Sequence, residues 1–212
     1  MTEIKTFTFN PFQVNTYIVY DNTKECIIID PGCYDDQERN ILKSFISTND
    51  LKPVRLFNTH CHVDHIMGNK FIKQEYGLDP EFHKEDHIFL ATAVQQANMF
   101  EVDIEPPPTT GIFIDENDTV TFGETEMEII HIPGHSPGSL VFYNKKDKFV
   151  IVGDVLFAGS IGRTDLPSGN YELLIQGIKE KLLNLDKDTV AYTGHGPETT
   201  IGYEAATNFY LT

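Results

Sequence analysis

The pattern of apolar residues predicts four β-strands in the first 60 positions. Residues 3–9 (EIKTFTF) and 16–21 (TYIVYD) alternate between polar and apolar side chains, as expected of strands with one buried face. Residues 26–32 (CIIIDPG) begin with an unbroken apolar run and end at Asp-Pro-Gly, which is typical of a buried strand followed by a turn. Residues 54–60 (VRLFNTH) predict a fourth strand, with a histidine at its C-terminal end.

Apolar residues at helical spacing predict helices between and after these strands. They cover residues 35–50, where acidic side chains come first, and then residues 64–77 and 83–98. A turn-rich segment follows at 105–111. The second half predicts strands at 119–122, 126–131, 139–143, 148–153 and 189–193, and helices at about 171–184 and 198–209.

The order of these elements favours an α/β fold built from two β-rich halves, each closing with helices. Two mixed β-sheets packed face to face, with helices on the outside, would satisfy this order as a four-layer αββα sandwich. No linker, low-complexity tract or tandem repeat divides the chain. We therefore expect a single domain over residues 1–212.

A short stretch after the fourth strand, THCHVDH at 59–65, concentrates side chains that bind metals. Side chains repeat with period two along a strand, so a strand end would present His60 and His62 on the same side. Asp64 and His65 would converge on them from the start of the next helix. Imidazole and carboxylate ligands suit Zn, Fe or Mn, and four such residues with more to follow can hold two ions.

Three more metal-binding side chains follow predicted strands in the second half of the chain. His135 lies in a Pro-Gly-bounded turn, Asp154 follows a glycine after an apolar strand, and His195 stands between two glycines. Glycine lets the backbone turn tightly and approach a site closely, and functional side chains concentrate in loops at strand ends. Together with the stretch at 59–65, these residues predict a metal site.

Other candidate ligands have simpler structural interpretations. His83 and His87 stand four residues apart in an acidic, polar run, which predicts a solvent-exposed helix face. His131 is expected at a strand end, without a role as a ligand. Cys61 alternates with the two neighbouring histidines, so its thiol should point away from the metals and into the core.

Two further polar pairs need no catalytic role. Ser136 and Ser139 flank a turn and are predicted to be turn residues, because metal chemistry needs no nucleophilic serine. Arg163 is most simply the ion-pair partner of Asp165, and its alternative role is contact with an anionic substrate.

Composition and charge narrow the function classes. The net charge is −16, with 16 Lys and Arg against 32 Asp and Glu, which argues against a nucleic-acid partner. The N-terminus lacks the pattern of a signal peptide, and no long apolar run predicts a membrane span. The three cysteines form no CxxC pair, so we expect a reduced, cytoplasmic protein without a membrane partner.

Four stretches carry a resemblance to a known family: THCHVDHIMGN, IPGHSPGS, GDVLFAGSIGRTDLP and TGHGPETTIGYE. They resemble the metallo-β-lactamase-fold hydrolases, and most closely the glyoxalase II-like (hydroxyacylglutathione hydrolase-like) branch, from about Phe9 to Asn208. The resemblance implies an αββα sandwich with two metal ions at one edge. It assigns His60, His62 and His135 to the first ion, Asp64, His65 and His195 to the second, Asp154 as the bridge, and Asp30 as the support of a ligand.

The resemblance also implies an activity. It indicates a metal-dependent hydrolase of a small-molecule thioester, an S-2-hydroxyacyl thiol, with two divalent metal ions that are Zn, or else Fe or Mn. Hydroxide bound to the metals would attack the acyl carbonyl, and Asp64 or Asp154 would be the catalytic carboxylate that orients it. Two alternatives stay open: an iron-dependent persulfide dioxygenase, and a metal-binding protein without turnover.

The sequence departs from related patterns in three places. Secreted lactamases of this fold typically lack an aspartate at the position of Asp154. Glyoxalase II members continue into a helical glutathione-binding domain, whereas the 17 residues after His195 contain no Lys or Arg, so we expect no such domain here. The long spacing from His65 to His135 predicts an insertion at about 78–118. Its large apolar residues are expected in the core first, or else in the substrate pocket: Phe89, Met99 and Phe100. The oligomeric state is open.

Overall fold

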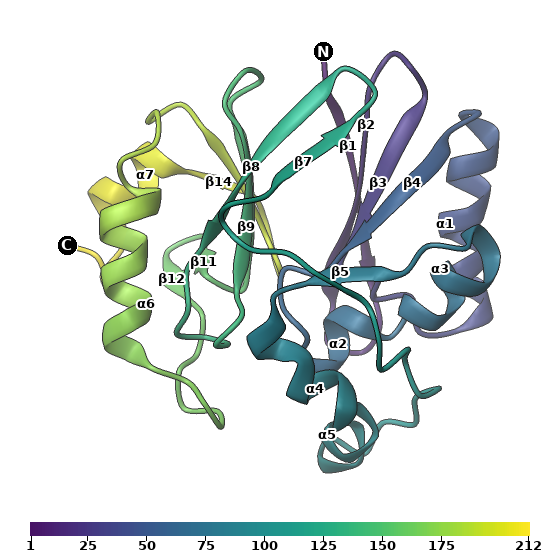
Figure 1. Ribbon diagram of the computed structural model, residues 1–212. Helices are drawn as coiled ribbons and strands as arrows, with labels where there is room; N and C mark the ends of the chain where they lie inside the picture. Colours follow the sequence, from purple (N-terminus) through teal and green to yellow (C-terminus); the bar gives the residue numbers. More distant parts are fainter.

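Two six-stranded β-sheets face each other in the computed structural model, which describes residues 1–212 (Figure 1). The strands of the first sheet lie in the order β1 (Glu3–Phe9), β2 (Val14–Tyr20), β3 (Glu25–Ile29), β4 (Lys52–Phe57), β5 (Pro80–Phe82) and β6 (Ile112–Phe113). Those of the second lie in the order β14 (Thr199–Thr200), β13 (Val190–Thr193), β10 (Phe149–Gly153), β9 (Leu140–Asn144), β8 (Thr125–His131) and β7 (Thr119–Phe122). A separate hairpin pairs β11 (Leu156–Phe157) with β12 (Ser160–Ile161).

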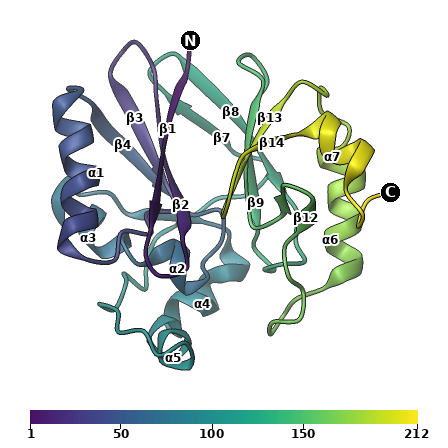
Figure 2. The same ribbon diagram turned by 180° about the vertical axis from the view of Figure 1, so that it is seen from behind.

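Helices cover the outer faces of both sheets. Those over the first sheet are α1 (Asp36–Thr48) and α3 (Asn69–Tyr76), and those over the second are α6 (Tyr171–Gly177), its π-helical continuation η2 (Ile178–Leu182) and α7 (Ile201–Thr207) (Figures 1 and 2). Shorter elements gather at one end: α2 (Val63–Ile66), the 3-10 turn η1 (Lys84–Asp86), α4 (His87–Ala91) and α5 (Ala93–Met99). The predicted αββα sandwich is confirmed.

Both sheets are mixed, as predicted. In the first sheet β1, β2 and β3 pair antiparallel, whereas β3, β4, β5 and β6 pair in parallel. In the second sheet β10 and β13 are parallel and the other neighbours are antiparallel. Parallel neighbours need crossover connections, and α1, α3 and α6 lie in those connections.

Three apolar layers hold the sheets and helices together. Between the sheets, the rings of Phe57 and Phe142 have centroids 5.3 Å apart. Leu42 of α1 packs on the outer face of the first sheet, and Leu174 of α6 packs on that of the second. Burial of a side chain of this size contributes about 1.5–3 kcal/mol. The layers therefore fix where the strands end, and so where their loops meet.

The predicted helix over 64–77 is wrong in one respect, because it breaks at Gly68. The Gly68 N–H donates to the carbonyl of Pro31 at 2.6 Å. A Cβ at Gly68 would lie 2.5 Å from Sγ of Cys33 and 2.6 Å from that same carbonyl oxygen. The chain therefore bends where its bare backbone packs on the turn at 31–33, and α2 and α3 are separate helices.

The predicted helix over 83–98 is also divided. It consists of η1, α4 and α5, and the strands on either side, β5 and β6, were not predicted. The exposed helix face predicted for His83 is wrong, since its side chain is 5% exposed and follows β5. That residues 78–118 are an insertion in a single domain stays a prediction. None of the helices has the length and apolar composition needed to cross a membrane.

Candidate metal centre

Residues 59–62 lie in a loop rather than at a strand end, and residues 63–65 already belong to α2. β4 stops at Phe57, and His62 is already the N-cap of α2. The predicted strand over 54–60 is therefore too long. The loop still brings the first two histidines together, because the ring centroids of His60 and His62 lie 4.8 Å apart. Asp64 and His65 follow within α2, as the sequence predicted for the next helix.

The other three predicted ligands follow strands of the second sheet. His135 lies in the turn between β8 and β9, Asp154 follows β10, and His195 follows β13. Gly194 lets the last two loops approach each other, because a Cβ at this position would lie 1.9 Å from Oδ1 of Asp154. The two sheets thus deliver their side chains to one place.

The seven predicted ligands form three overlapping groups, each with its ligand atoms within 4.8 Å of one another: His60, His62 and His135; His60, His65 and Asp154; and Asp64, His65 and His195. Asp154 lies between sets of imidazoles. Its Oδ1 is 3.4 Å from Nε2 of His65, whereas its Oδ2 is 3.5 Å from Nε2 of His135. The same Oδ2 is 3.6 Å from Nε2 of His195. The Asp154 carboxylate therefore faces imidazoles of both the first and the third of these groups.

Backbone carbonyls orient two of the imidazoles from outside. Nδ1 of His135 donates to the carbonyl of Arg163 at 2.8 Å. Nδ1 of His195 donates to the carbonyl of Phe12 at 3.0 Å. A carbonyl oxygen only accepts, so each ring carries a proton on Nδ1, and in the neutral ring the inward Nε2 is the nitrogen with the lone pair.

Asp30 orients two more imidazoles. Its buried carboxylate accepts from Nδ1 of His65 at 2.9 Å and from Oγ1 of Thr59 at 2.6 Å. Since the Thr59 hydroxyl donates its proton to Asp30, its oxygen accepts from Nδ1 of His60, 3.1 Å away. The inward Nε2 atoms of His60 and His65 are therefore unprotonated in the neutral rings. Partners of this kind are the ones that fix metal-binding histidines.

The inward atoms fit a cation better than they fit one another. Nε2 of His60 and Nε2 of His135 lie 3.2 Å apart, although both carry lone pairs and neither brings a proton. Nε2 of His65 and Oδ1 of Asp154 are buried without a hydrogen-bond partner. Such orphaned polar atoms are costly, and an ion among them would satisfy all four. The residues present therefore fit a divalent metal bound by nitrogen and oxygen.

The electrostatics of the cluster differ between its histidines, because nearby carboxylates outweigh burial and raise the pKa of His65 and of His195. Burial and the surrounding imidazoles lower the pKa of His60 well below its ordinary value. Burial and His135 lower the pKa of His62 to about 3. Both rings are therefore neutral at pH 7 and available as ligands, because a metal competes with a proton for the same lone pair.

Comparisons with known proteins give the family. A match to the metallo-beta-lactamase superfamily covers residues 9–195. The chain belongs to the metallo-beta-lactamase superfamily. Hydroxyacylglutathione hydrolase GloC of Haemophilus influenzae is 38% identical over 202 residues, which cover 94% of this chain and 93% of that protein.

Solved structures of the superfamily agree with this assignment. BLEG-1 B3 metallo-beta-lactamase superposes with a TM-score of 0.90 at 33% identity, over 99% of this chain and 100% of that chain. TTHA1623 in a di-iron-bound form superposes with a TM-score of 0.88 at 34% identity, over 98% and 100%. The predicted fold is confirmed, and so is the resemblance to the glyoxalase II-like branch. The chain is a hydrolase of this superfamily.

Asp86 is a residue of the centre that the sequence did not reveal. Its buried carboxylate accepts from the N–H of Cys61 at 2.8 Å, between two predicted ligands. It also accepts from the N–H of Gly138 at 2.6 Å and from the hydroxyl of Ser136, in the turn that carries His135. One side chain thus ties together the two loops that form the first ligand group. Its only sequence signal is an aspartate at the start of a predicted helix.

Aromatic side chains border the cluster. The ring of Phe89 lies 5.0 Å from that of His62, and the ring of Phe157 lies 6.2 Å from that of His195. Phe89 was predicted to lie in the core together with Met99 and Phe100, and it is half-buried. The core prediction is wrong for Met99, which is 77% exposed, and for Phe100, which is 46% exposed. Cys61 is buried among apolar neighbours, as predicted. Two aromatic rings, those of Phe89 and Phe157, therefore border the centre.

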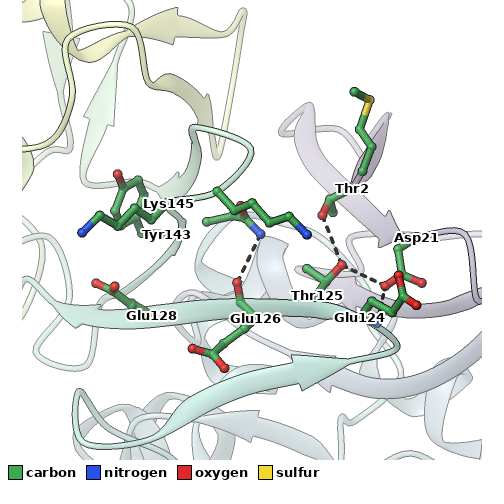
Figure 3. Close-up of a pocket in the computed structure, with 11 residues that line it drawn as sticks. Thr2, Asp21, Glu124, Thr125, Glu126, Glu128, Tyr143 and Lys145 are labelled. Atoms are coloured by element: carbon green, nitrogen blue, oxygen red, sulfur yellow. Dashed lines mark hydrogen bonds between the residues drawn. The ribbon is translucent and has the colours of Figure 1, made fainter.

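A surface pocket lies away from this centre (Figure 3). It is lined by residues of the N-terminus, the β7–β8 hairpin and the end of β9, and none of the seven predicted ligands lines it. Figure 3 shows the hydroxyl of Thr125 bonded to both Thr2 and Asp21, at 3.1 and 2.9 Å. These bonds join the two sheets, so the pocket has a structural explanation.

Proposed function

We propose that the chain is a metal-dependent hydrolase of thioesters that acts on S-2-hydroxyacyl thiols. The observation that carries the proposal is the position of Asp154, whose two oxygens face different imidazoles, as expected of a carboxylate that bridges two ions. Under this proposal one ion has three histidines, the other has a mixed set, and Asp154 binds both: His60, His62 and His135 for the first, and Asp64, His65 and His195 for the second. The name of the Haemophilus influenzae relative supports a thioester substrate.

The donor set suits zinc first. Imidazole nitrogen and carboxylate oxygen are ligands that Zn²⁺ accepts in catalytic sites, and Fe and Mn accept the same set. The di-iron form of TTHA1623 makes iron the first alternative. When bound, two divalent ions would supply an acidified water and would polarise the acyl carbonyl.

The chain's own carboxylates have a separate task. Oδ2 of Asp64 lies 3.1 Å from Nε2 of His195, and Oδ2 of Asp154 lies 3.6 Å from the same nitrogen. A water held there finds a carboxylate acceptor on either side. In this proposal Asp64 and Asp154 accept a hydrogen bond from the attacking water and orient it toward the carbonyl carbon.

The surroundings of the cluster favour a neutral acyl group. Phe89 and Phe157 place apolar rings against His62 and His195. Arg163 is adjacent through its backbone, but its guanidinium donates to both oxygens of Asp165 at 2.8 and 2.7 Å. This pair was predicted from the sequence, and it engages two of the three guanidinium nitrogens of Arg163.

Hydrolysis of a β-lactam is a second candidate. BLEG-1, named a B3 metallo-beta-lactamase, is 33% identical over 99% of this chain. A β-lactam and a thioester both present an acyl carbonyl to the same attacking water. The two candidates therefore share the centre and differ in the leaving group.

One set of assays separates these activities. The metal content of protein purified without added metal is measured first. The same protein is then assayed with a panel of S-2-hydroxyacyl thiols, with a β-lactam, and in an oxygen electrode with a thiol persulfide. We expect two ions per chain and thioester turnover, which Asp154→Asn reduces at least 100-fold and the exposed-site control Asp36→Asn leaves unchanged. Oxygen uptake with one iron would support the dioxygenase instead, and turnover of no thioester would refute the proposal.

A further inference from the structure

A second cluster of metal-binding side chains lies apart from the seven predicted ligands. His83, Glu85 and His131 have ligand atoms within 4.8 Å of one another, and none of them belongs to the other three groups. His83 directly follows β5 of the first sheet, and His131 is the last residue of β8 in the second. The cluster therefore spans the two sheets.

The ring of His131 is held in the tautomer that a metal ligand needs. Its Nε2 donates to the carbonyl of Pro137 at 2.8 Å, so the proton is on Nε2 and the lone pair is on Nδ1. A backbone carbonyl behind one ring nitrogen is the usual partner of a metal-binding histidine.

The ring of His83 is neutral and loosely held. It stacks on His131 with centroids 4.2 Å apart and planes 22° from parallel. Burial and His131 lower its pKa, which favours the neutral ring, and a neutral ring keeps one nitrogen lone pair for a metal. One long hydrogen bond, 3.4 Å from the N–H of Glu85, reaches this ring. The two imidazoles thus lie in contact without a hydrogen bond between them.

The charged side chains around the rings of His83 and His131 are mostly carboxylates. Glu85 and Asp115 act on His83 against Lys84, and beside His131 the charge of Lys181 is paired with that of Glu116. A cation entering between the rings would therefore meet an excess of negative charge. Glu85 is exposed, so its carboxylate can adjust to the cation.

We propose that His83, Glu85 and His131 form a third metal site, which takes a divalent transition metal such as Zn²⁺. Two imidazole nitrogens and one carboxylate oxygen provide three ligands and leave a fourth position for water. Bonds of about 2.0–2.1 Å to zinc require donor atoms roughly 3.3 Å apart. The three donors, which lie within 4.8 Å of one another, reach that spacing by small movements that the loosely held His83 ring and the exposed Glu85 permit.

Occupation of this site would brace the predicted catalytic centre. The ion joins the segment after β5 to the end of β8. His131 is bonded to Pro137, which belongs to the turn that carries His135. The site thus acts on the position of His135 from outside, without supplying a ligand to that centre.

Zinc counting tests the proposal. Wild-type protein and His131→Asn are dialysed against buffers of graded free zinc, and bound zinc per chain is measured by mass spectrometry. We expect wild type to bind one ion more than His131→Asn at high free zinc. Glu85→Gln should need at least about tenfold more free zinc for that last ion, because it removes the anionic ligand. The difference between variants does not depend on how many ions the other seven residues hold.

His87→Asn is the matched control, because His87 is an exposed neighbouring histidine outside the group. It should bind as much zinc as wild type. Thermal unfolding of each variant shows whether it is folded. If His131→Asn does not fold, Glu85→Gln, a substitution of an exposed residue, tests the proposal instead. The measured quantity is then the free zinc concentration at which the last ion is half bound. Equal zinc content in wild type and His131→Asn, or an unshifted midpoint in Glu85→Gln, would overturn the proposal.

Discussion

Asp30 holds the ring of His65 through a 2.9 Å hydrogen bond to Nδ1, and the same carboxylate accepts from the backbone and hydroxyl of Thr59. Asp30 has φ +50°, a conformation that non-glycine residues adopt at a cost of about 1–3 kcal/mol. The backbone of Asp30 therefore adopts a strained conformation, which places its carboxylate against His65 and Thr59.

Asp30→Asn should weaken zinc binding about 10–100-fold, as expected when the partner of a metal-binding histidine is altered. Oδ1 accepts from the N–H of Thr59, and Oδ2 accepts from the Thr59 hydroxyl and from Nδ1 of His65, so an amide with one acceptor oxygen cannot keep all three bonds. Affinity is measured by competition with a chromophoric chelator. Asp36→Asn, at a side chain that is 93% exposed, is the control. Unchanged affinity in Asp30→Asn would show that the orientation of His65 does not matter for binding.

Asp86→Asn should lower both stability and metal affinity. The amide nitrogen would face an N–H donor where the carboxylate now accepts from Cys61 and Gly138. Loss of such a buried bond costs about 1–3 kcal/mol. Urea unfolding measures the first effect and chelator competition the second. Ser136→Ala removes only the hydroxyl bond and should give a smaller effect on both; an equal or larger effect would count against Asp86 as the tie between the two loops.

The sequence singled out seven residues that the structure gathers in one cluster, because their signals are local. Each is a residue type that binds metals, and most stand beside a glycine or a turn after an apolar run. The mixed sheets followed from the same runs. Where the prediction failed, the deciding contact was remote in the chain. The break at Gly68 depends on Pro31 and Cys33, and the roles of Asp86 and His83 depend on a turn and a strand about 50 residues away. A prediction from the spacing of apolar residues within a short segment cannot include contacts between residues so far apart in the chain.

Gly194→Ala should disrupt the centre while leaving the fold in place. A Cβ would lie 1.9 Å from Oδ1 of Asp154, which is closer than any contact allows, so the carboxylate must leave its position between the imidazoles. We expect loss of at least one bound ion, measured by metal analysis, with a circular dichroism spectrum like that of wild type. Gly77→Ala provides the comparison, because Gly77 has φ +72° but no neighbour within 4 Å of its added Cβ. Full metal content in Gly194→Ala would contradict the proposed bridging role of Asp154.

Removal of metal should destabilise the chain. Without an ion, the Nε2 atoms of His60 and His135 face each other at 3.2 Å with unpaired lone pairs. An ion bound only by the folded state adds about 4 kcal/mol at a free concentration 1,000 times its Kd. Calorimetry should show that a chelator lowers the unfolding temperature and that zinc restores it in proportion to the logarithm of its concentration. Magnesium, which prefers oxygen ligands, is the negative control. An unfolding temperature independent of zinc would refute a folded-state metal site.

Asp21, which lies away from the metal centre, should make the free energy of unfolding depend on pH in the acid range. Its burial alone would raise its pKa, but hydrogen bonds from Thr23, Glu124 and Thr125 outweigh burial and lower it. A carboxylate whose pKa is lowered by folding stabilises the protein above its unfolded pKa of about 4, and that stabilisation is lost as the pH falls through the folded value. Asp21→Asn should therefore cost about 1–3 kcal/mol at pH 7.

The difference between wild type and Asp21→Asn should shrink below about pH 4, where the wild-type carboxylate becomes protonated. Urea unfolding at pH 7 and at steps below pH 5 measures it. Asp188→Asn, at a side chain that is 85% exposed, should show little difference at either pH. A gap between wild type and Asp21→Asn that stays constant down to the acid limit would mean that hydrogen bonding at this position does not depend on its charge. The bonds from Thr125 and the N–H of Glu124 would then hold the two sheets together equally well with a neutral acceptor.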